Sequence, residues 1–294
     1  MAPKSILVTG ASGYIGGTFL ATFLDGSNEW VNHYQVSVLV RTKGQADFAR
    51  ANNITPVLFE HVRRLGASDQ DRHRPYWSRM ASRQIPHLWT REETKDLGQK
   101  VHFLSISGTS NFSDRQVTGK FIDNRVKSDE EDMYSCEKYR ESFEHYPQRT
   151  TDVTIVEHGE RAGMSTYIVI PPIIHGIGRG EFNKFTFQLP IMVQAAKKCS
   201  SVAMIGEGTS IYDHVHVEDI ASLLNTLLAR IHDGQDIPSG KRGIYFCESG
   251  EHTVLKERGA IESDEVKSLD LQAVADLYLP GLPLTLVELP FAGK

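Results

Sequence analysis

The sequence predicts an α/β fold in which a doubly wound parallel sheet carries a small C-terminal lobe. Two observations lead to this class. Short apolar runs typical of buried strands alternate along the chain with segments of helical periodicity, as in parallel sheets covered by helices. The first run, at 5–9, ends at a turn with glycines at three-residue spacing, and an amphipathic segment follows. A strand, a tight turn and a helix N-terminus are therefore expected there.

The glycine turn predicts a binding site for the pyrophosphate of a dinucleotide. Backbone N–H groups of such a turn and the positive end of the next helix attract an anion. Gly10 permits the turn, Gly13 lets the backbone approach the phosphates, and Gly16 lets the helix lie close to the strand. The flanking strand and helix make the pattern specific and predict a Rossmann-like domain. The expected cofactor-binding residues here are Gly10, Ser12, Gly13, Tyr14, Ile15 and Gly16.

The end of the second expected strand indicates which dinucleotide is preferred. The run at 35–40 is largely apolar, as expected for a strand covered on both faces. An acidic residue after such a strand hydrogen-bonds the ribose 2′-hydroxyl of NAD. This chain has Arg41 and Lys43 instead, and two cations suit a 2′-phosphate, so we expect NADP(H) to be favoured over NAD(H). The alternative is that both are solvated loop charges.

Later apolar and periodic segments extend the alternating pattern. Further strands are expected at 55–60, 101–107 and 166–170. The clearest helix is expected at 217–232, where apolar residues recur on one face, and Gly234 is well placed to end it. We expect a dinucleotide-binding domain over 1–170. Residues 171–294 are expected to combine a substrate lobe with elements that return to the same sheet.

Composition predicts a globular protein of enzyme size with a small-molecule substrate. The chain has 294 residues, 40% of them hydrophobic, and a net charge of −5. An acidic balance argues against nucleic acid or an anionic membrane as partner. The first strand follows the N-terminus directly, which predicts no signal peptide and a cytoplasmic location. Three scattered cysteines, Cys136, Cys199 and Cys247, form no metal pattern and fit a reducing compartment.

One stretch, at 61–95, departs from the pattern of the rest of the chain. It has no clear apolar run or helical period, and it holds two of the three tryptophans among arginines and histidines. A basic surface insertion is one interpretation. A shifted reading frame or misjudged exon is the other, because a clean strand pattern returns at 101–107. In either case one central strand of the expected sheet is missing or degraded.

Five motifs, in order along the chain, carry a resemblance to a known superfamily. They lie at 9–16, 107–110, 134–138, 171–176 and 213–219. Together they resemble the extended, atypical short-chain dehydrogenase/reductase superfamily. Within it, the chain is similar to fungal NAD(P)-binding proteins of the epimerase/dehydratase-like and nitrogen-repression-regulator-like types. The resemblance covers roughly 4–60 and 101–250 and implies a Rossmann-like fold with a nicotinamide cofactor.

The resemblance implies a catalytic hydroxyl group just after the strand at 101–107. In that superfamily a serine or threonine there polarises a substrate carbonyl or hydroxyl, and Ser107, Thr109 and Ser110 all offer that chemistry. The alternative is a hydroxyl-rich turn whose side chains bond to the local backbone.

The resemblance also implies a tyrosine and a lysine one helical turn apart. Tyr134 and Lys138 meet this spacing, and the lysine would lower the pKa of the tyrosine for proton transfer. The rival is Tyr146, which lies nearer the usual distance from the next strand. It has Thr150 where the lysine is needed, and Pro147 would disrupt a helix interior. An ordinary surface pair is the alternative for Tyr134 and Lys138.

Two later motifs complete the expected site. Pro171, which with Pro172 ends the strand at 166–170, resembles the loop that closes over the nicotinamide, although a strand-ending turn is the alternative. His214 and His216 lie on one face of an extended segment, but no third ligand is evident and no metal is expected. They resemble a segment leading into a helix beside the substrate pocket.

Two functions follow from these motifs. The first is an NAD(P)-dependent oxidoreductase or epimerase-like enzyme acting on a small carbonyl or hydroxyl substrate. The second is a catalytically silent NADP(H)-binding sensor or regulatory protein. The spacing of Tyr134 and Lys138 favours the enzyme, and the degraded stretch at 61–95 favours the sensor. A homodimer or a protein partner is compatible with both.

Overall fold

The computed structural model describes residues 4–58, 100–114, 121–123, 125–199, 202–205, 211–253 and 266–269. Two compact units are formed. The first comprises Met1–Ala67, Ile174–Phe187 and Val215–Ile237, and the second comprises Ser68–Ile173, Gln188–His214 and Pro238–Lys294. The expected division near residue 170 stays a prediction. The stretch at 61–95 lies outside the described residues.

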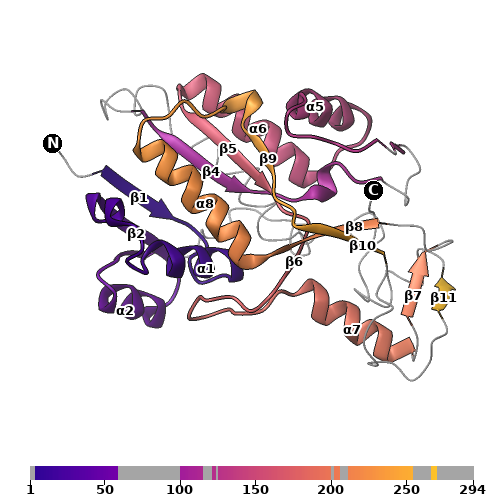
Figure 1. The fold of residues 1–294 in the computed structure, drawn as a ribbon, viewed down its shortest axis with the longest axis horizontal. Helices are drawn as coiled ribbons and strands as arrows, with labels where there is room; N and C mark the ends of the chain where they lie inside the picture. Colours follow the sequence, from indigo (N-terminus) through magenta and orange to yellow (C-terminus); the bar gives the residue numbers. More distant parts are fainter. Residues whose placement is uncertain are drawn as a thin grey trace, which may run out of the picture. The chain divides into compact units, whose positions relative to one another are not determined.

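The first unit is built on a parallel sheet with the strand order β1-β2-β3. Its strands are β1 (Lys4–Val8), β2 (Tyr34–Val40) and β3 (Thr55–Leu58), joined through α1 (Tyr14–Phe23) and α2 (Lys43–Ala51). These elements are the indigo to violet part of Figure 1. β1 and β2 are each followed by a helix and then a parallel strand, which is the connection expected of a doubly wound sheet.

Local sequence explains why the helices of this unit form where they do. Thr42 and Gln45 make a reciprocal capping box that starts α2 directly after β2. The helix α8 (Val217–His232) packs along α1, and its bounds confirm those predicted from its apolar period. Gly234 follows with φ +69°, a conformation that favours glycine.

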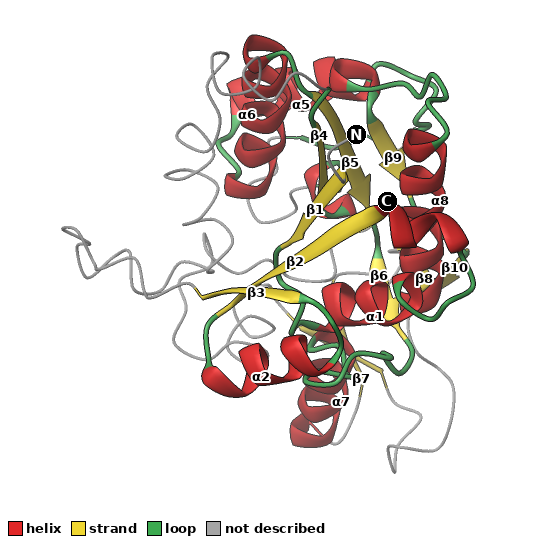
Figure 2. Cartoon of the chain, turned by 90° about the vertical axis from the view of Figure 1, so that its left-hand side faces the viewer, coloured by secondary structure: helices red, strands yellow, loops and turns green. Residues whose placement is uncertain are grey.

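The second unit has its own parallel sheet, with the order β4-β5-β9. It consists of β4 (His102–Ile106), β5 (Ser165–Ile170) and β9 (Ile244–Phe246), and all six residues of β5 are buried. The helix α6 (Pro147–Ala162) packs on β5, and α5 (Met133–Phe143) packs on α6. Figure 2 shows α5 and α6 near β4 and β5.

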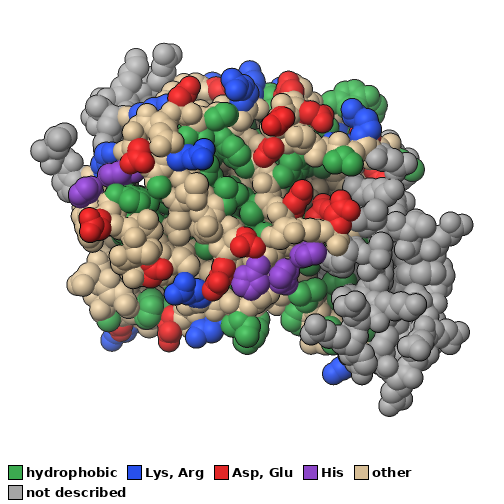
Figure 3. Space-filling view, viewed as in Figure 1, with side chains coloured by type: hydrophobic (Ala, Val, Ile, Leu, Met, Phe, Trp, Pro, Cys, Tyr) green, Lys and Arg blue, Asp and Glu red, His purple; other side chains and the backbone are tan. Residues whose placement is uncertain are grey.

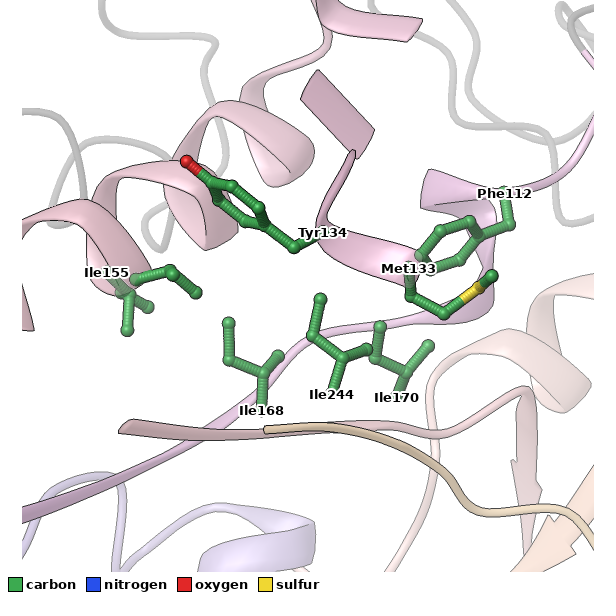
Figure 4. Close-up of a cluster of buried hydrophobic side chains, with 8 residues drawn as sticks. Phe112, Met133, Tyr134, Ile155, Ile168, Ile170 and Ile244 are labelled. Carbon is green, nitrogen blue, oxygen red and sulfur yellow. The ribbon is translucent and has the colours of Figure 1, made fainter. Parts of the chain in front are cut away.

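The core of the second unit lies between its sheet and these two helices. Val156, Ile168 and Ile170 are fully buried there, and Figure 4 shows most of the surrounding cluster. The cluster consists of Phe112, Met133, Tyr134, Ile155, Val156, Ile168, Ile170 and Ile244. Burying this apolar surface holds β5 and β9, the start of α5 and the middle of α6 together.

Shorter elements complete the described chain. The strands β8 (Ile211–His216) and β10 (Gly250–Thr253) pair antiparallel. The strands β7 (Val202–Ile205) and β11 (Val266–Leu269) pair parallel. No helix in the described ranges is both long and apolar enough to cross a membrane. On the face shown in Figure 3, acidic and basic side chains are interspersed. The remaining elements are η1 (Glu29–His33), η3 (Thr109–Asn111), β6 (Ile173–His175), α7 (Gln188–Cys199) and η4 (Gly240–Arg242).

The α/β class with parallel sheets, predicted from the alternating pattern, is confirmed. The strands expected at 55–60, 101–107 and 166–170 are present in the described residues, and the ends of the second and third are shifted by one residue. Such shifts are usual, since strand ends are set by tertiary contacts rather than by the apolar run itself.

Candidate active site

The glycine turn in the first unit has the geometry expected from the sequence. Gly10 adopts φ +70°, and the Gly13 amide donates to the Gly10 carbonyl at 2.8 Å, closing the turn. A Cβ atom at Gly16 would collide with the Gly10 carbonyl group. Gly10 is thus needed for its positive φ, and Gly16 is needed because α1 approaches the turn closely.

The N-terminus of α1 has free capacity for an anion. Gly13 is the N-cap residue, no side chain caps the helix, and no acidic residue lies in its first turn. The first amides of a helix lack partners within the helix, and its dipole favours negative charge there. Ser12 and Ile15, expected beside the phosphates, flank this N-cap and are partly exposed. The turn therefore fits a phosphate group.

Tyr14 fixes the start of α1 to a distant segment of the same unit. Its ring is buried, and its hydroxyl donates to the Gly176 carbonyl at 2.7 Å. Burial raises the pKa of Tyr14 to about 12, so this hydroxyl stays protonated and remains a donor. Tyr14 thus joins the loop after β6 to the glycine turn.

Arg41 is exposed at the end of β2, beside the start of α2. Its amide donates to the Gln45 side chain at 2.9 Å, so the capping box that starts α2 also fixes the Arg41 backbone. Lys43 is the first residue of α2 and is exposed. Both cations therefore extend from a rigid strand-to-helix junction.

Substituting Gly16 with alanine tests the turn. The new methyl group would force the Gly10 carbonyl to move, which should destabilise the protein by about 1–3 kcal/mol. Nucleotide binding, followed by the fluorescence of NADPH, should weaken strongly because the amides lose their alignment. Gly44→Ala is the matched control: its methyl group meets nothing within 4 Å and should leave binding unchanged. Unchanged binding in Gly16→Ala would contradict this role.

In the second unit, side chains after β4 and at the start of α6 form one hydrogen-bond chain. The Tyr146 hydroxyl donates to Ser110 Oγ at 3.1 Å, and Ser110 donates to Gln148 Oε1 at 2.9 Å. Gln148 Nε2 then donates to Ser107 Oγ at 3.2 Å, and Ser107 donates to Asp152 Oδ2 at 2.5 Å. The chain runs in one direction, from a phenol to a carboxyl group.

This direction separates the roles of the expected hydroxyl groups. The Ser107 hydrogen is already given to Asp152, which is 1% exposed, so Ser107 is not free to donate to a substrate oxygen. Ser110, at the other end of the chain, donates to the neutral Gln148 amide and accepts from Tyr146. Among the expected residues that follow β4, Ser110 is therefore the better placed to meet a substrate.

Thr109 and Pro171 lie close together through the backbone. The Thr109 amide donates to the Pro171 carbonyl at 3.1 Å, which joins the turn after β4 to the end of β5. A Cβ atom at Gly108 would lie 2.7 Å from Gln148 Nε2, so the missing side chain makes room for this amide. The two neighbouring strand ends thus hold the hydroxyl-rich turn in place.

Tyr134 and Lys138 lie one turn apart on α5, as expected, but both bond to a third residue. The Tyr134 hydroxyl and Lys138 Nζ donate to the same Glu157 oxygen, at 3.1 and 2.8 Å. Burial, together with this carboxylate, raises the pKa of Tyr134, whereas the resemblance implied a lowered value. Figure 4 shows the Tyr134 ring beside the buried cluster with its hydroxyl directed away. The dyad stays a prediction.

Tyr146 is positioned differently from what the sequence suggested. Pro147 was expected to be incompatible with a helix interior, and in the structure it lies at a helix start instead. Pro147 is the first residue of α6, where the missing N–H costs no hydrogen bond, so Tyr146 is the N-cap residue. The ring is 4% exposed, and the chain of hydrogen bonds begins at its hydroxyl.

The sequence analysis missed four polar residues of this network. They are Asn111, Glu137, Gln148 and Asp152. A signal existed for the two acids, because each falls on the buried face of its helix at helical spacing from apolar neighbours. Ionisable residues at such core positions are uncommon unless they are paired or functional. Gln148 and Asn111 carry no comparable signal.

The histidines of β8 have structural partners. His216 is the N-cap residue of α8 and accepts from the Glu218 amide at 3.3 Å. Its ring also contacts that of His175, with centroids 5.2 Å apart. The described ranges contain no group of three or more histidine, cysteine or acidic side chains arranged to hold a metal ion.

Comparisons with known proteins agree with the fold. The chain is 25% identical to the oxidase ucsJ of an Acremonium species, over 93% of this chain and 85% of that protein. The dTDP-glucose 4,6-dehydratase DesIV from Streptomyces venezuelae, solved with NAD and TYD bound, matches with a TM-score of 0.55 and 16% identity, over 95% and 92% of the two chains. UDP-glucuronic acid 4-epimerase from Bacillus cereus, in complex with UDP-glucuronic acid and NAD, matches with a TM-score of 0.52 and 13% identity, over 96% and 95%.

The family match covers the second unit's network and much of the first unit's later segments. The sequence profile of the NAD dependent epimerase/dehydratase family matches residues 92–238, which is half of the chain. This range includes the end of β4, both helices of the network and the loop that Tyr14 contacts. The chain belongs to the NAD dependent epimerase/dehydratase family.

Proposed function

We propose that this protein is an NAD(P)(H)-dependent oxidoreductase or epimerase-like enzyme acting on a small carbonyl or hydroxyl substrate. The observation that carries the proposal is the hydroxyl pair of Ser110 and Tyr146, which heads a hydrogen-bond chain just after β4. A partly buried pair of this kind can orient a substrate oxygen and exchange a proton with it. The family membership supports a nicotinamide cofactor.

In this proposal Tyr146 exchanges the proton and Ser110 orients the substrate oxygen. Tyr146 can turn its hydrogen from Ser110 toward a substrate carbonyl, while Ser110 remains held by Gln148. The substrate oxygen would accept from one hydroxyl or from both. Tyr134 with Lys138 is the second candidate for the proton transfer, since both groups share the Glu157 oxygen. Thr150 follows Tyr146 by one turn, so the Tyr146 assignment lacks the lysine partner.

The glycine turn supports the cofactor part of the proposal. Its uncapped amides fit a diphosphate, and Arg41 with Lys43 fits the additional 2′-phosphate of NADP(H). A bound nicotinamide would supply or accept the hydride. The residues of this chain would bind the cofactor, orient the substrate oxygen and move one proton.

Replacing Arg41 with alanine tests the cofactor preference. We expect NADPH affinity to fall about 10- to 100-fold, as for loss of a charge-assisted hydrogen bond, with NADH affinity nearly unchanged. Titrations followed by nucleotide fluorescence and melting temperature measure both. Arg50→Ala is the control, because Arg50 is exposed and pairs with Asp47 on α2. An equal loss for both nucleotides would contradict the preference.

Turnover separates the enzyme from a silent binder. Purified protein with NADPH or NADH is offered a panel of aldehydes, ketones and nucleotide sugars, and nucleotide absorbance is followed. Oxidation of the nucleotide with any carbonyl, lost in Tyr146→Phe, is the expected result. Tight stoichiometric binding with no turnover on the whole panel would instead support the sensor.

A further inference from the structure

The hydrogen-bond chain ends at two acids buried side by side. Glu137 on α5 is 0% exposed and Asp152 on α6 is 1% exposed. One nitrogen, Asn111 Nδ2, lies 2.8 Å from an oxygen of Glu137 and 2.6 Å from an oxygen of Asp152, so the two carboxyl groups are close together. Two ionised carboxylates at this separation would repel one another, which favours a proton on one of them. Two charges at such a site would also be far too costly without water.

One amide binds both acids. Asn111 Nδ2 donates to Glu137 Oε1 at 2.8 Å and to Asp152 Oδ2 at 2.6 Å, while its contact to Ser107 Oγ is longer, at 3.3 Å. The two hydrogens of the amide thus go to the two acids. Asn111 Oδ1 and Glu137 Oε2 are buried without a partner among the described residues. An oxygen without a donor suits a protonated acid better than a carboxylate.

Burial and the neighbouring charges favour a proton on the pair formed by Glu137 and Asp152. Burial, reinforced by Asp152, raises the pKa of Glu137 well above its usual range, although Arg149 acts in the opposite direction. Burial also raises the pKa of Asp152 to about 7. Arg149 from α6 is directed to Glu141 and to backbone carbonyls, and Arg140 from α5 donates to the Ser113 carbonyl. The hydrogen bonds of the Arg149 guanidinium thus go to Glu141 and to the Asn111 and Glu144 carbonyls.

We propose that Glu137 and Asp152 share one proton and act as positioning residues that fix the direction of the hydrogen-bond chain. Glu137 holds the proton, and the Asp152 oxygen accepts from Ser107. Ser107 must then accept from Gln148 Nε2, which turns Gln148 Oε1 toward Ser110. Ser110 in turn donates to Gln148 and accepts from Tyr146. The acid pair thereby sets the orientation of the last two hydroxyl groups.

The orientation of Ser110 and Tyr146 by the acid pair matters for catalysis only if the proposed function is correct, and in that respect this inference rests on it. A neutral amide at position 152 could donate to Ser107 and let Ser107 donate to Gln148 instead. Gln148 could then rotate, Ser110 would accept from it, and the Tyr146 hydrogen would no longer be held by Ser110. Asp152→Asn should therefore disorder the hydroxyl groups of Ser110 and Tyr146, which are linked to position 152 through Gln148 and Ser107.

Infrared spectroscopy tests the shared proton without cofactor or substrate. Above the pH at which ordinary carboxyl groups ionise, the wild-type protein should retain the carbonyl band of a protonated carboxylic acid. The double variant Glu137→Gln/Asp152→Asn should remove this band, and Glu160→Gln, at an exposed acid on α6, should leave it in place. A wild-type spectrum with no such band near neutral pH would overturn the proposal, even if the double variant failed to fold.

The pH dependence of stability provides a second test. Because both pKa values are raised in the native protein, the stability from this pair is present at low pH and is lost as pH rises through them. Urea unfolding of the wild type should therefore show stability falling between about pH 5 and pH 8. The double variant Glu137→Gln/Asp152→Asn, in which both side chains are neutral at every pH, should flatten this fall, and Glu160→Gln should not.

A double-mutant cycle tests the positioning role. Asp152→Asn and Ser110→Ala change residues that share no contact but belong to one chain. If the chain transmits orientation, the change in the unfolding equilibrium constant of the double variant should differ from the product of the two single-variant changes by at least about twofold. Multiplicative effects would overturn the positioning role. If the wild-type protein shows the infrared band but oxidises no NADPH with any carbonyl, that result would count against the proposed function alone.

Discussion

Replacing Tyr146 with phenylalanine is expected to lower kcat by about 10²- to 10⁴-fold, the usual contribution of a positioned acid or base. The change removes only the hydroxyl that donates to Ser110 and keeps the buried ring. Nucleotide affinity and melting temperature should change little. The rate of NADPH oxidation with an active carbonyl, under saturating substrate, measures the effect.

Tyr134→Phe is the matched control for this experiment. It also removes one phenol hydroxyl from a buried ring, and that hydroxyl donates to Glu157. If Tyr146 transfers the proton, Tyr134→Phe should retain activity within about threefold. A large loss in Tyr134→Phe with an active Tyr146→Phe would reverse the assignment and restore Tyr134 and Lys138 as the catalytic pair.

Replacing Arg149 with methionine is expected to destabilise the protein by about 3–5 kcal/mol, as when one partner of a buried ion pair is removed. Arg149 is 1% exposed, and its guanidinium bonds Glu141 and the backbone carbonyls of Asn111 and Glu144. The substitution leaves Glu141 without its buried cation. Urea unfolding at pH 7 measures the change.

Arg161→Met, at the exposed end of the same helix, is the control and should change stability by less than about 0.5 kcal/mol. The effect of Arg149→Met should also depend on pH. Burial alone would raise the pKa of Glu141, but hydrogen bonds from Thr150, the Tyr146 amide and Arg149 outweigh it and lower the pKa. The stability from Glu141 is thus present above the usual carboxyl range and is lost as pH falls through the lowered pKa. Equal stabilities of both variants would contradict this account.

The first unit could be predicted from the sequence in some detail because its signals are local. The spacing of Gly10, Gly13 and Gly16 follows from backbone geometry within one turn. The bounds of α8 follow from its apolar period and from Gly234. Such features depend on neighbours in the chain, and local chemistry determines them.

The network of the second unit could be predicted only in part, because it depends on contacts distant in sequence. The spacing of Tyr134 and Lys138 is a correct local reading of α5, but Glu157 from α6 takes both of their donors. Tyr146 lacks a lysine one turn on, yet the packing of α6 on β5 brings it to Ser110. No pattern within one segment reports either contact.

The packing of α1 against the loop that Tyr14 also contacts has an evolutionary consequence. A Cβ atom at Gly17 would lie 3.1 Å from the Gly180 Cα, and one at Gly180 would lie 2.7 Å from the Gly17 Cα. Two backbones therefore touch where each lacks a side chain. A homologue that keeps this contact must keep glycine at both positions, and one that loses either glycine must have moved the loop. The pair should be retained or replaced together, so an alignment of relatives would show which of them share this arrangement.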